Sequence, residues 1–305
     1  MKILISGSSG FIGTALVEAL AREGHTVCRL VRPQSAGQSG PQGSAVHWDP
    51  LSGELDSAAA EGAQAVVNLA GASIAEGRWS NARKRVLRSS RVDATRQLVG
   101  ALSRLTRPPQ VFVSASAIGY YGDRGDEELT EQSAPGSDFL AALARNWEAE
   151  AARAAGFGAR VVLPRFGLIL AARGGALPRM LLPFRLGVGG RLGPGKQWMS
   201  WLTLADAVGI IRYALASSGV QGPVNAVTPH AVRNAEFTAT LGRVLRRPTL
   251  FPAPAMALRL ALGEMAQALL LSSQRVLPRK LEDLGYSFQQ PRLEPALRAI
   301  LARAA

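Results

Sequence analysis

Largely apolar runs alternate with amphipathic stretches through the first half of this 305-residue chain. The apolar runs occupy residues 2–7, 26–31, 45–48, 63–71, 111–117 and 159–165. Between them, apolar residues recur at helical spacing over residues 11–25, about 81–103 and 138–155. Strands that alternate with helices and are apolar on both faces belong to sheets that helices cover on both sides. The pattern therefore predicts an α/β fold with a doubly wound parallel sheet.

The rhythm changes after Arg165. Residues 174–197 are rich in glycine and proline, which predicts a segment that leaves the sheet and forms a wall over a pocket. Helical spacing returns over residues 201–215, and the last 60 or so residues are expected to be mostly helical. Residues 33–44 are the one flexible-looking loop.

A glycine-rich turn, GSSGFIG, joins the first predicted strand to the first predicted helix. Gly7 permits the sharp turn, Gly10 lets the backbone approach a pyrophosphate, and Gly13 allows close packing of helix on strand. The positive N-terminus of the helix then faces the phosphates. This context predicts a Rossmann-like dinucleotide site. The turn residues expected to line it are Gly7, Ser8, Ser9, Gly10, Phe11, Ile12 and Gly13.

The end of the second predicted strand indicates which dinucleotide binds. An acidic residue there would bind the 2′-hydroxyl of NAD, but this chain has Val31 and Arg32. A guanidinium pairs bidentately with a 2′-phosphate, so NADP is favoured over NAD; the alternative is that Arg32 is a surface charge. Leu69, Ala70 and Gly71, after another strand, are expected beside the adenosine and ribose.

Several motifs together resemble the extended short-chain dehydrogenase/reductases. They are the GSSGFIG turn, NLAG at 68–71, VSASAIGYYG at 113–122 and GPGKQWMSWLTLADAV at 193–208. More narrowly, the chain resembles the epimerase family proteins of the SDR39U1 type, through RW at 78–79, DF and WE at 138–139 and 147–148, and residues 174–190. The resemblance covers nearly the whole chain. It implies an oxidoreductase or epimerase that acts on a small carbonyl, hydroxyl or sugar-like substrate.

The resemblance also implies roles for individual residues. Ser116 matches the serine that touches the substrate, with Ser114 close behind it, and Arg91 falls where the family places groups facing the pyrophosphate. A dinucleotide-binding domain is then expected over residues 1–165, with residues 200–228 returning to it. Residues 166–305 are expected to form the substrate-side and C-terminal helical region.

The chain departs from the family at its catalytic helix. Most relatives carry Tyr-x-x-x-Lys there, with tyrosine as the acid and lysine lowering its pKa. Alignment on Glu148 puts Leu140 and Ala144 at these positions. A change of register does not restore the motif. The residues four places beyond the four tyrosines are Arg124, Gly125, Ser217 and Gln290.

Three explanations remain open. In the first, the chain is an NADP-dependent reductase or epimerase with a displaced acid, Tyr120 or Tyr121, beside Ser116 and helped by Arg145 or Lys196. In the second, it binds NADP without turnover, as a sensor or interaction protein. In the third, the fold serves an unrelated function.

Charge and composition limit the partners. The net charge is +13, but the arginines are spread along the chain without interleaved aromatic residues, so an anionic cofactor or substrate is favoured over nucleic acid. The longest apolar stretch, residues 254–271, is interrupted by Arg259 and Glu264, so no membrane association is expected.

No leader pattern opens the chain and Cys28 is the single cysteine, as in a cytoplasmic protein. Three scattered histidines indicate no metal site, and a monomer or homodimer is expected.

Overall fold

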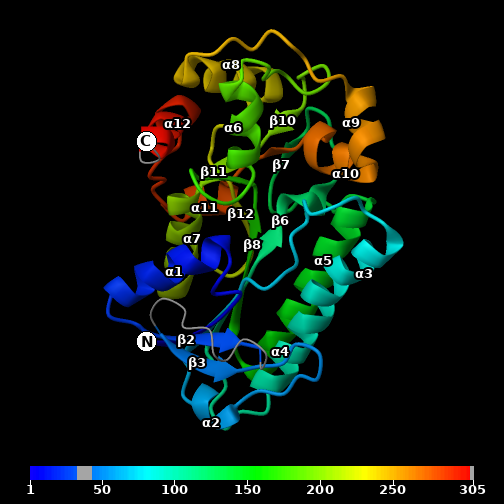
Figure 1. Cartoon of the computed structure of the whole chain (residues 1–305). Coiled ribbons are helices and arrows are strands. Elements are labelled where there is room, and N and C mark those ends of the chain that lie inside the picture. Colours follow the sequence, from blue (N-terminus) through cyan, green and yellow to red (C-terminus); the bar gives the residue numbers. More distant parts are fainter. Residues whose placement is uncertain (33–42, 303–305) are drawn as a thin grey trace.

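A parallel sheet forms the centre of the molecule, in the computed structural model, which describes residues 1–32 and 43–302. The loop expected at residues 33–44 lies almost wholly outside the described residues. The strand order is β3-β2-β1-β4-β5-β8-β12, and β6 (Ser116–Ala117) continues the line of β5 along β8 (Figure 1). The strands are β1 (Lys2–Ser6), β2 (Thr26–Val31), β3 (Ser44–His47), β4 (Ala65–Asn68), β5 (Val111–Ser114), β8 (Arg160–Phe166) and β12 (Gly222–Ala226).

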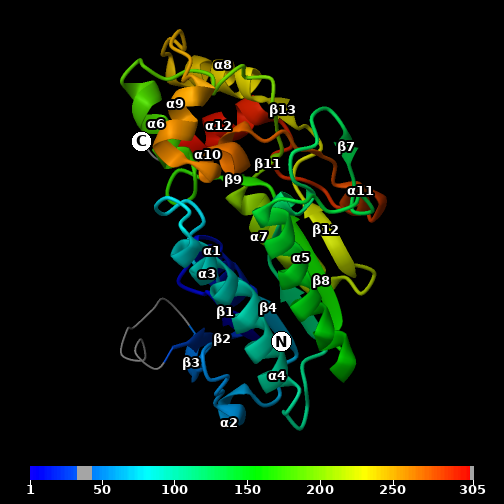
Figure 2. The same cartoon turned by 90° about the vertical axis from the view of Figure 1, so that its right-hand side faces the viewer.

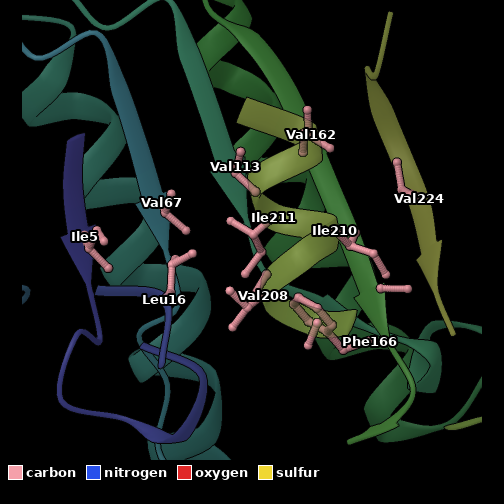
Figure 3. Packing of buried hydrophobic residues seen from close by; sticks show 14 of the residues in the cluster. Ile5, Leu16, Val67, Val113, Val162, Phe166, Val208, Ile210, Ile211 and Val224 are labelled. Carbon is pink, nitrogen blue, oxygen red and sulfur yellow. The ribbon is translucent and has the colours of Figure 1, made fainter. Parts of the chain in front are cut away.

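Helices cover both faces of this sheet (Figure 2). α1 (Phe11–Arg22) and α7 (Leu204–Ala216) pack on one face, and α4 (Ala94–Leu102) and α5 (Phe139–Ala152) pack on the other. Strand residues alternate between the two cores, as a period of two requires: Ile3 and Ile5 face α1, whereas Leu4 faces α4. Figure 3 shows the first core, with Leu16 of α1 and Ile211 of α7 against the strands. The predicted doubly wound sheet is confirmed.

The sheet winds in opposite directions from β1. Strands β2 and β3 continue to one side and β4, β5, β8 and β12 to the other, so the β1/β4 pair marks the reversal. The carboxyl ends of these two strands border the crevice where ligands bind in open sheets of this kind.

Two of the expected helices differ from the prediction in detail. The helix expected at about 81–103 consists of α3 (Asn81–Arg88), a π-helical turn (Ser89–Asp93) and α4. The helix expected from residue 201 is wrong at its start, because Trp201–Thr203 forms strand β11, which pairs with β9 (Leu168–Leu170). The helix α7 begins only at Leu204, where the Thr203 hydroxyl accepts a hydrogen bond from the Asp206 amide.

The rest of the chain forms a helical region at the carboxyl ends of the strands (Figure 1). Helices α6 (Leu177–Arg185), α8 (Asn234–Leu245) and α12 (Leu293–Ala302) share a core of their own. The helical region also contains α9 (Ala255–Leu262), α10 (Glu264–Ala266) with a π-helical turn (Gln267–Leu271), and α11 (Arg279–Asp283). β10 (Trp198–Met199) and β13 (Val232–Arg233) form an antiparallel pair there.

A strand pair, hydrogen bonds and apolar packing attach this helical region to the sheet domain, and Met265 and Leu281 belong to the core of the sheet. β14 (Arg275–Val276) pairs with β7 (Glu128–Leu129), which lies between β6 and α5 in the sequence. The small helix α2 (Ser57–Ala60) and the 3-10 helices Ile118–Tyr121 and Arg153–Phe157 complete the fold. Within the described ranges, no helix combines the length and the apolar character needed to cross a membrane.

Candidate functional site

The glycine turn between β1 and α1 has the geometry that the sequence predicted for Gly7 and Gly13. Gly7 has φ +70°, and a Cβ there would lie 2.7 Å from the Leu69 carbonyl carbon. A Cβ on Gly13 would lie 2.2 Å from the Gly7 carbonyl oxygen, so only glycine lets α1 approach the turn. No side chain caps α1 at Gly10, so its first amide groups can bind a phosphate.

Arg91 lies beside Gly71, at the edge of the same crevice. A Cβ on Gly71 would lie 3.0 Å from the Arg91 guanidinium carbon. This guanidinium donates to the carbonyls of Ala72 (3.0 Å) and Leu87 (3.4 Å) and forms no ion pair with a carboxylate of the described residues. Burial, with the charge of Arg83, lowers the pKa of Arg91 to about 10, so it stays charged at neutral pH. A desolvated cation without a counter-ion fits the pyrophosphate of a dinucleotide.

The other residues expected at the cofactor lie at the same edge of the sheet, where the strands end. Leu69 and Ala70 follow β4 and contact the glycine turn. Val31 ends β2 and Arg32 follows it, exposed to solvent. Because β2 pairs with β1, Arg32 at the end of β2 lies one strand away from the glycine turn at the end of β1. The residues present therefore fit a dinucleotide.

Ser114 belongs to a polar layer beneath this crevice and is fully buried. The Asn68 amide nitrogen donates to the hydroxyls of Ser114 (3.1 Å) and Thr95 (2.9 Å), while its oxygen accepts from Ser6 (2.5 Å). The Trp147 indole also donates to Thr95, at 2.9 Å. These bonds hold the ends of β1, β4 and β5 in register with α4 and α5.

The hydroxyl of Ser116 binds a buried ion pair. It donates to Glu148 Oε1 at 2.6 Å. Arg165 donates to both oxygens of the same carboxylate, each at 2.8 Å, and the three side chains are all less than a tenth exposed. Burial opposes the charge of Arg165, but the hydrogen bonds and charge of Glu148 outweigh it and raise the pKa of the guanidinium. Arg165 and Glu148 thus form a buried ion pair.

Tyr121 extends this network and is completely buried. Its hydroxyl accepts from Arg165 Nη1 at 2.9 Å and donates to Asn225 Oδ1 at 2.6 Å. Burial raises the pKa of Tyr121 to about 12, against the opposing effect of the Arg165 charge. We call Ser116, Glu148, Arg165, Tyr121 and Asn225 the buried network.

Tyr120 is only half-buried, and the Arg165 guanidinium stacks on its ring at 3.5 Å from the centroid. On α5, Leu140 and Ala144 are buried, and a Cβ on Gly119 would lie 3.3 Å from the Leu140 Cβ. The two positions of the missing Tyr and Lys are therefore apolar packing positions. A cavity of about 440 Å³ adjoins Leu140 and reaches from Trp79 and Phe139 to Glu264 and Gln267 of the helical region.

The partners in the buried network were not found from sequence. Glu148 served only to align the helix, and Asn225 carried no signal, because it lies 104 residues from Tyr121. Lys196, a suggested electrostatic helper, is exposed and lines a different cavity with Arg233. Arg145 has no hydrogen-bonding partner among the described residues that would connect it to the network.

The glycine turn, the crevice at β1 and β4 and the Arg91 cation define a Rossmann-type α/β protein with residues that fit a dinucleotide. Residues 3–226 match the model of the NAD dependent epimerase/dehydratase family, and residues 253–300 match a domain of unknown function, DUF1731.

The chain belongs to the NAD dependent epimerase/dehydratase family, and relatives cover its full length. An epimerase family protein of Mycobacterium bovis is 43% identical over 97% of this chain and 96% of its own. The human epimerase family protein SDR39U1 is 36% identical over 99% of this chain and 100% of its own.

Solved structures agree in fold. A crystal structure of human SDR39U1 with NADPH has a TM-score of 0.89 and 35% identity, and covers 99% of both chains. A nucleoside-diphosphate sugar epimerase from Corynebacterium glutamicum has a TM-score of 0.80 and 34% identity, and covers 99% of this chain and 58% of its own. The resemblance to the SDR39U1 type is thus confirmed.

Proposed function

We propose that this chain binds NADP(H) and that dinucleotide binding, without proton transfer by a Ser–Tyr pair, is its function. Such a protein acts as a sensor of the dinucleotide or as an interaction protein. The observation that carries the proposal is the buried network. Ser116 donates its only proton to Glu148, and Tyr121 donates its own to Asn225. Neither hydroxyl is free to donate to a substrate unless its hydrogen bond inside the buried network is broken.

The preference for NADP over NAD depends on Arg32. It follows β2 in the position where an acidic residue would bind the 2′-hydroxyl of NAD, and it is exposed. A guanidinium there pairs with the 2′-phosphate. The human SDR39U1 protein, which was crystallised with NADPH, supports the same choice.

A second candidate is an oxidoreductase or epimerase that acts on a small carbonyl, hydroxyl or sugar-like substrate. The cavity of about 440 Å³ beside Leu140 favours it, since that is where a substrate would lie next to the catalytic helix. In this case Tyr120 is the remaining acid, because it is half-buried while Ser116 and Tyr121 are enclosed.

Calorimetric titration with NADPH and NADH tests the cofactor. We expect NADPH to bind more tightly, and Arg32→Gln to weaken NADPH by roughly tenfold or more while leaving NADH unchanged. Arg107→Gln removes an exposed arginine paired with Glu61, far from the turn, and is the matched control. Absence of binding, or tighter binding of NADH, would contradict the proposal.

Single-turnover oxidation of NADPH over a panel of carbonyl substrates separates the two candidates. We expect no substrate-dependent oxidation by the wild type. If oxidation occurs and Tyr120→Phe abolishes it, the second candidate is correct. If Ser116→Ala or Tyr121→Phe abolishes it while the melting temperature is kept, the buried network opens during turnover and our interpretation of it is wrong.

A further inference from the structure

Most of the exposed large apolar side chains belong to the helical region. Those in this region that are more than half exposed come from the end of α6, the loop after it, the segment after α8 and α9. We call this set the apolar surface; it consists of Leu182, Leu186, Val188, Leu250, Phe251, Met256 and Leu260. α9 supplies two of these and has no buried residue at all.

The two stretches of chain that carry these residues lie side by side. The Gly193 amide donates to the Ala253 carbonyl at 2.8 Å, and the Ala253 amide donates to the Arg191 carbonyl at 2.9 Å. A Cβ on Gly190 would lie 1.9 Å from the Phe251 carbonyl oxygen. Figures 1 and 2 place α6 and α9 at the same end of the molecule, opposite α2, although Figure 1 shows a separation between them. The loop after α6 and the segment before α9 thus carry their apolar side chains on adjoining stretches of chain, which favours a contact surface over scattered exposures.

Arginines are interspersed with these apolar residues. They are exposed, and none pairs with a carboxylate of residues 1–32 or 43–302; they are Arg185, Arg191, Arg246, Arg247 and Arg259. Residues 173–259 contain eleven Lys and Arg but only two acidic residues, Asp206 and Glu236. The surface is therefore apolar and strongly cationic at once.

The combination of apolar and cationic side chains favours some binding partners of this surface over others. A second copy would bring two arginine-rich surfaces together, which like charges disfavour. Single-stranded nucleic acid is bound through aromatic stacking, but six of these seven side chains are not aromatic. A bilayer with anionic headgroups satisfies both features, because apolar side chains enter the acyl boundary while arginines bind lipid phosphates.

We propose that the apolar surface docks on an anionic lipid bilayer. No membrane association was expected from the sequence because the apolar stretch at 254–271 is interrupted by charges, but peripheral docking needs no spanning helix. The proposal does not depend on cofactor binding.

Flotation with lipid vesicles tests the proposal. We expect the full chain to float with vesicles of equimolar phosphatidylglycerol and phosphatidylcholine, to stay in solution with phosphatidylcholine alone, and to be released by high salt. Failure to bind the anionic vesicles, or equal binding to both kinds, would overturn it.

Two variants separate the apolar and the charged contributions. Met256→Ser with Leu260→Ser is expected to weaken binding to anionic vesicles by at least roughly tenfold. Arg185→Gln with Arg247→Gln is expected to weaken it by roughly twenty-fivefold, about fivefold for each arginine. Leu51→Ser, at an equally exposed leucine in the loop after β3, is the control and should bind normally.

Melting temperature and NADPH affinity show that each variant is folded and separate this test from that of the cofactor. Sedimentation of the protein without lipid then measures whether it self-associates. If the wild type self-associates and the Met256→Ser, Leu260→Ser variant does not, the apolar surface is a contact between copies and the lipid proposal is wrong.

Discussion

At the scale of single residues, Arg91 carries a charge that no carboxylate of the described residues neutralises. Burial lowers its pKa to about 10, and two backbone carbonyls are its hydrogen-bonding partners. A pyrophosphate would supply the missing counter-charge. We therefore expect Arg91→Gln to weaken NADPH binding by about ten- to a hundredfold, while the melting temperature of the ligand-free protein is kept or rises. Calorimetry and thermal melting measure the two. A lower melting temperature with unchanged affinity would show that Arg91 is purely structural.

At the scale of elements, α8 ends in a conformation that suits glycine better than its own residue. Arg246 has φ +55° and is the one non-glycine residue with positive φ in the described part of the chain. The left-handed conformation brings the Cβ of an L-residue too close to its own backbone. Arg246→Gly should therefore raise the free energy of unfolding by about 1 kcal/mol, measured by urea denaturation. Arg247→Gly removes the same charge next to it without a positive φ, and should not stabilise the protein.

At the scale of the whole molecule, the C-terminal segment is part of the fold and not an appendage. Leu293 and Leu297 of α12 pack into the core of α6 and α8, and Val276 pairs with the strand that contains Leu129. Removing several such side chains, each worth about 1.5–3 kcal/mol, exceeds the marginal stability of a domain. We expect a chain that ends at residue 252 to be insoluble or rapidly degraded by protease. A fragment that melts cooperatively and binds NADPH would show that residues 253–305 form an independent unit.

Local features were predictable from sequence because their causes are local. The Gly7 and Gly13 positions follow from steric limits within one turn, and the α5 helix follows from the spacing that begins after Asp138. The helix predicted from residue 201 began too early for a non-local reason. Trp201 shares the apolar spacing of α7, but it pairs with Leu168 on another strand and is fully buried.

The doubly wound sheet, the dinucleotide turn and the loss of Tyr-x-x-x-Lys could be read from the chain, since periodicity, glycine placement and residue identity are properties of the sequence. The family resemblance also indicated Ser116 and Tyr121 as hydroxyls beside the expected reaction centre. What those hydroxyls bind became visible in the folded structure. Their partners come from α5, β8 and β12, which the parallel sheet brings to one place from distant parts of the chain. Burial there turns two expected proton donors into members of a hydrogen-bonded network, because a buried hydroxyl without a partner inside the protein is destabilising.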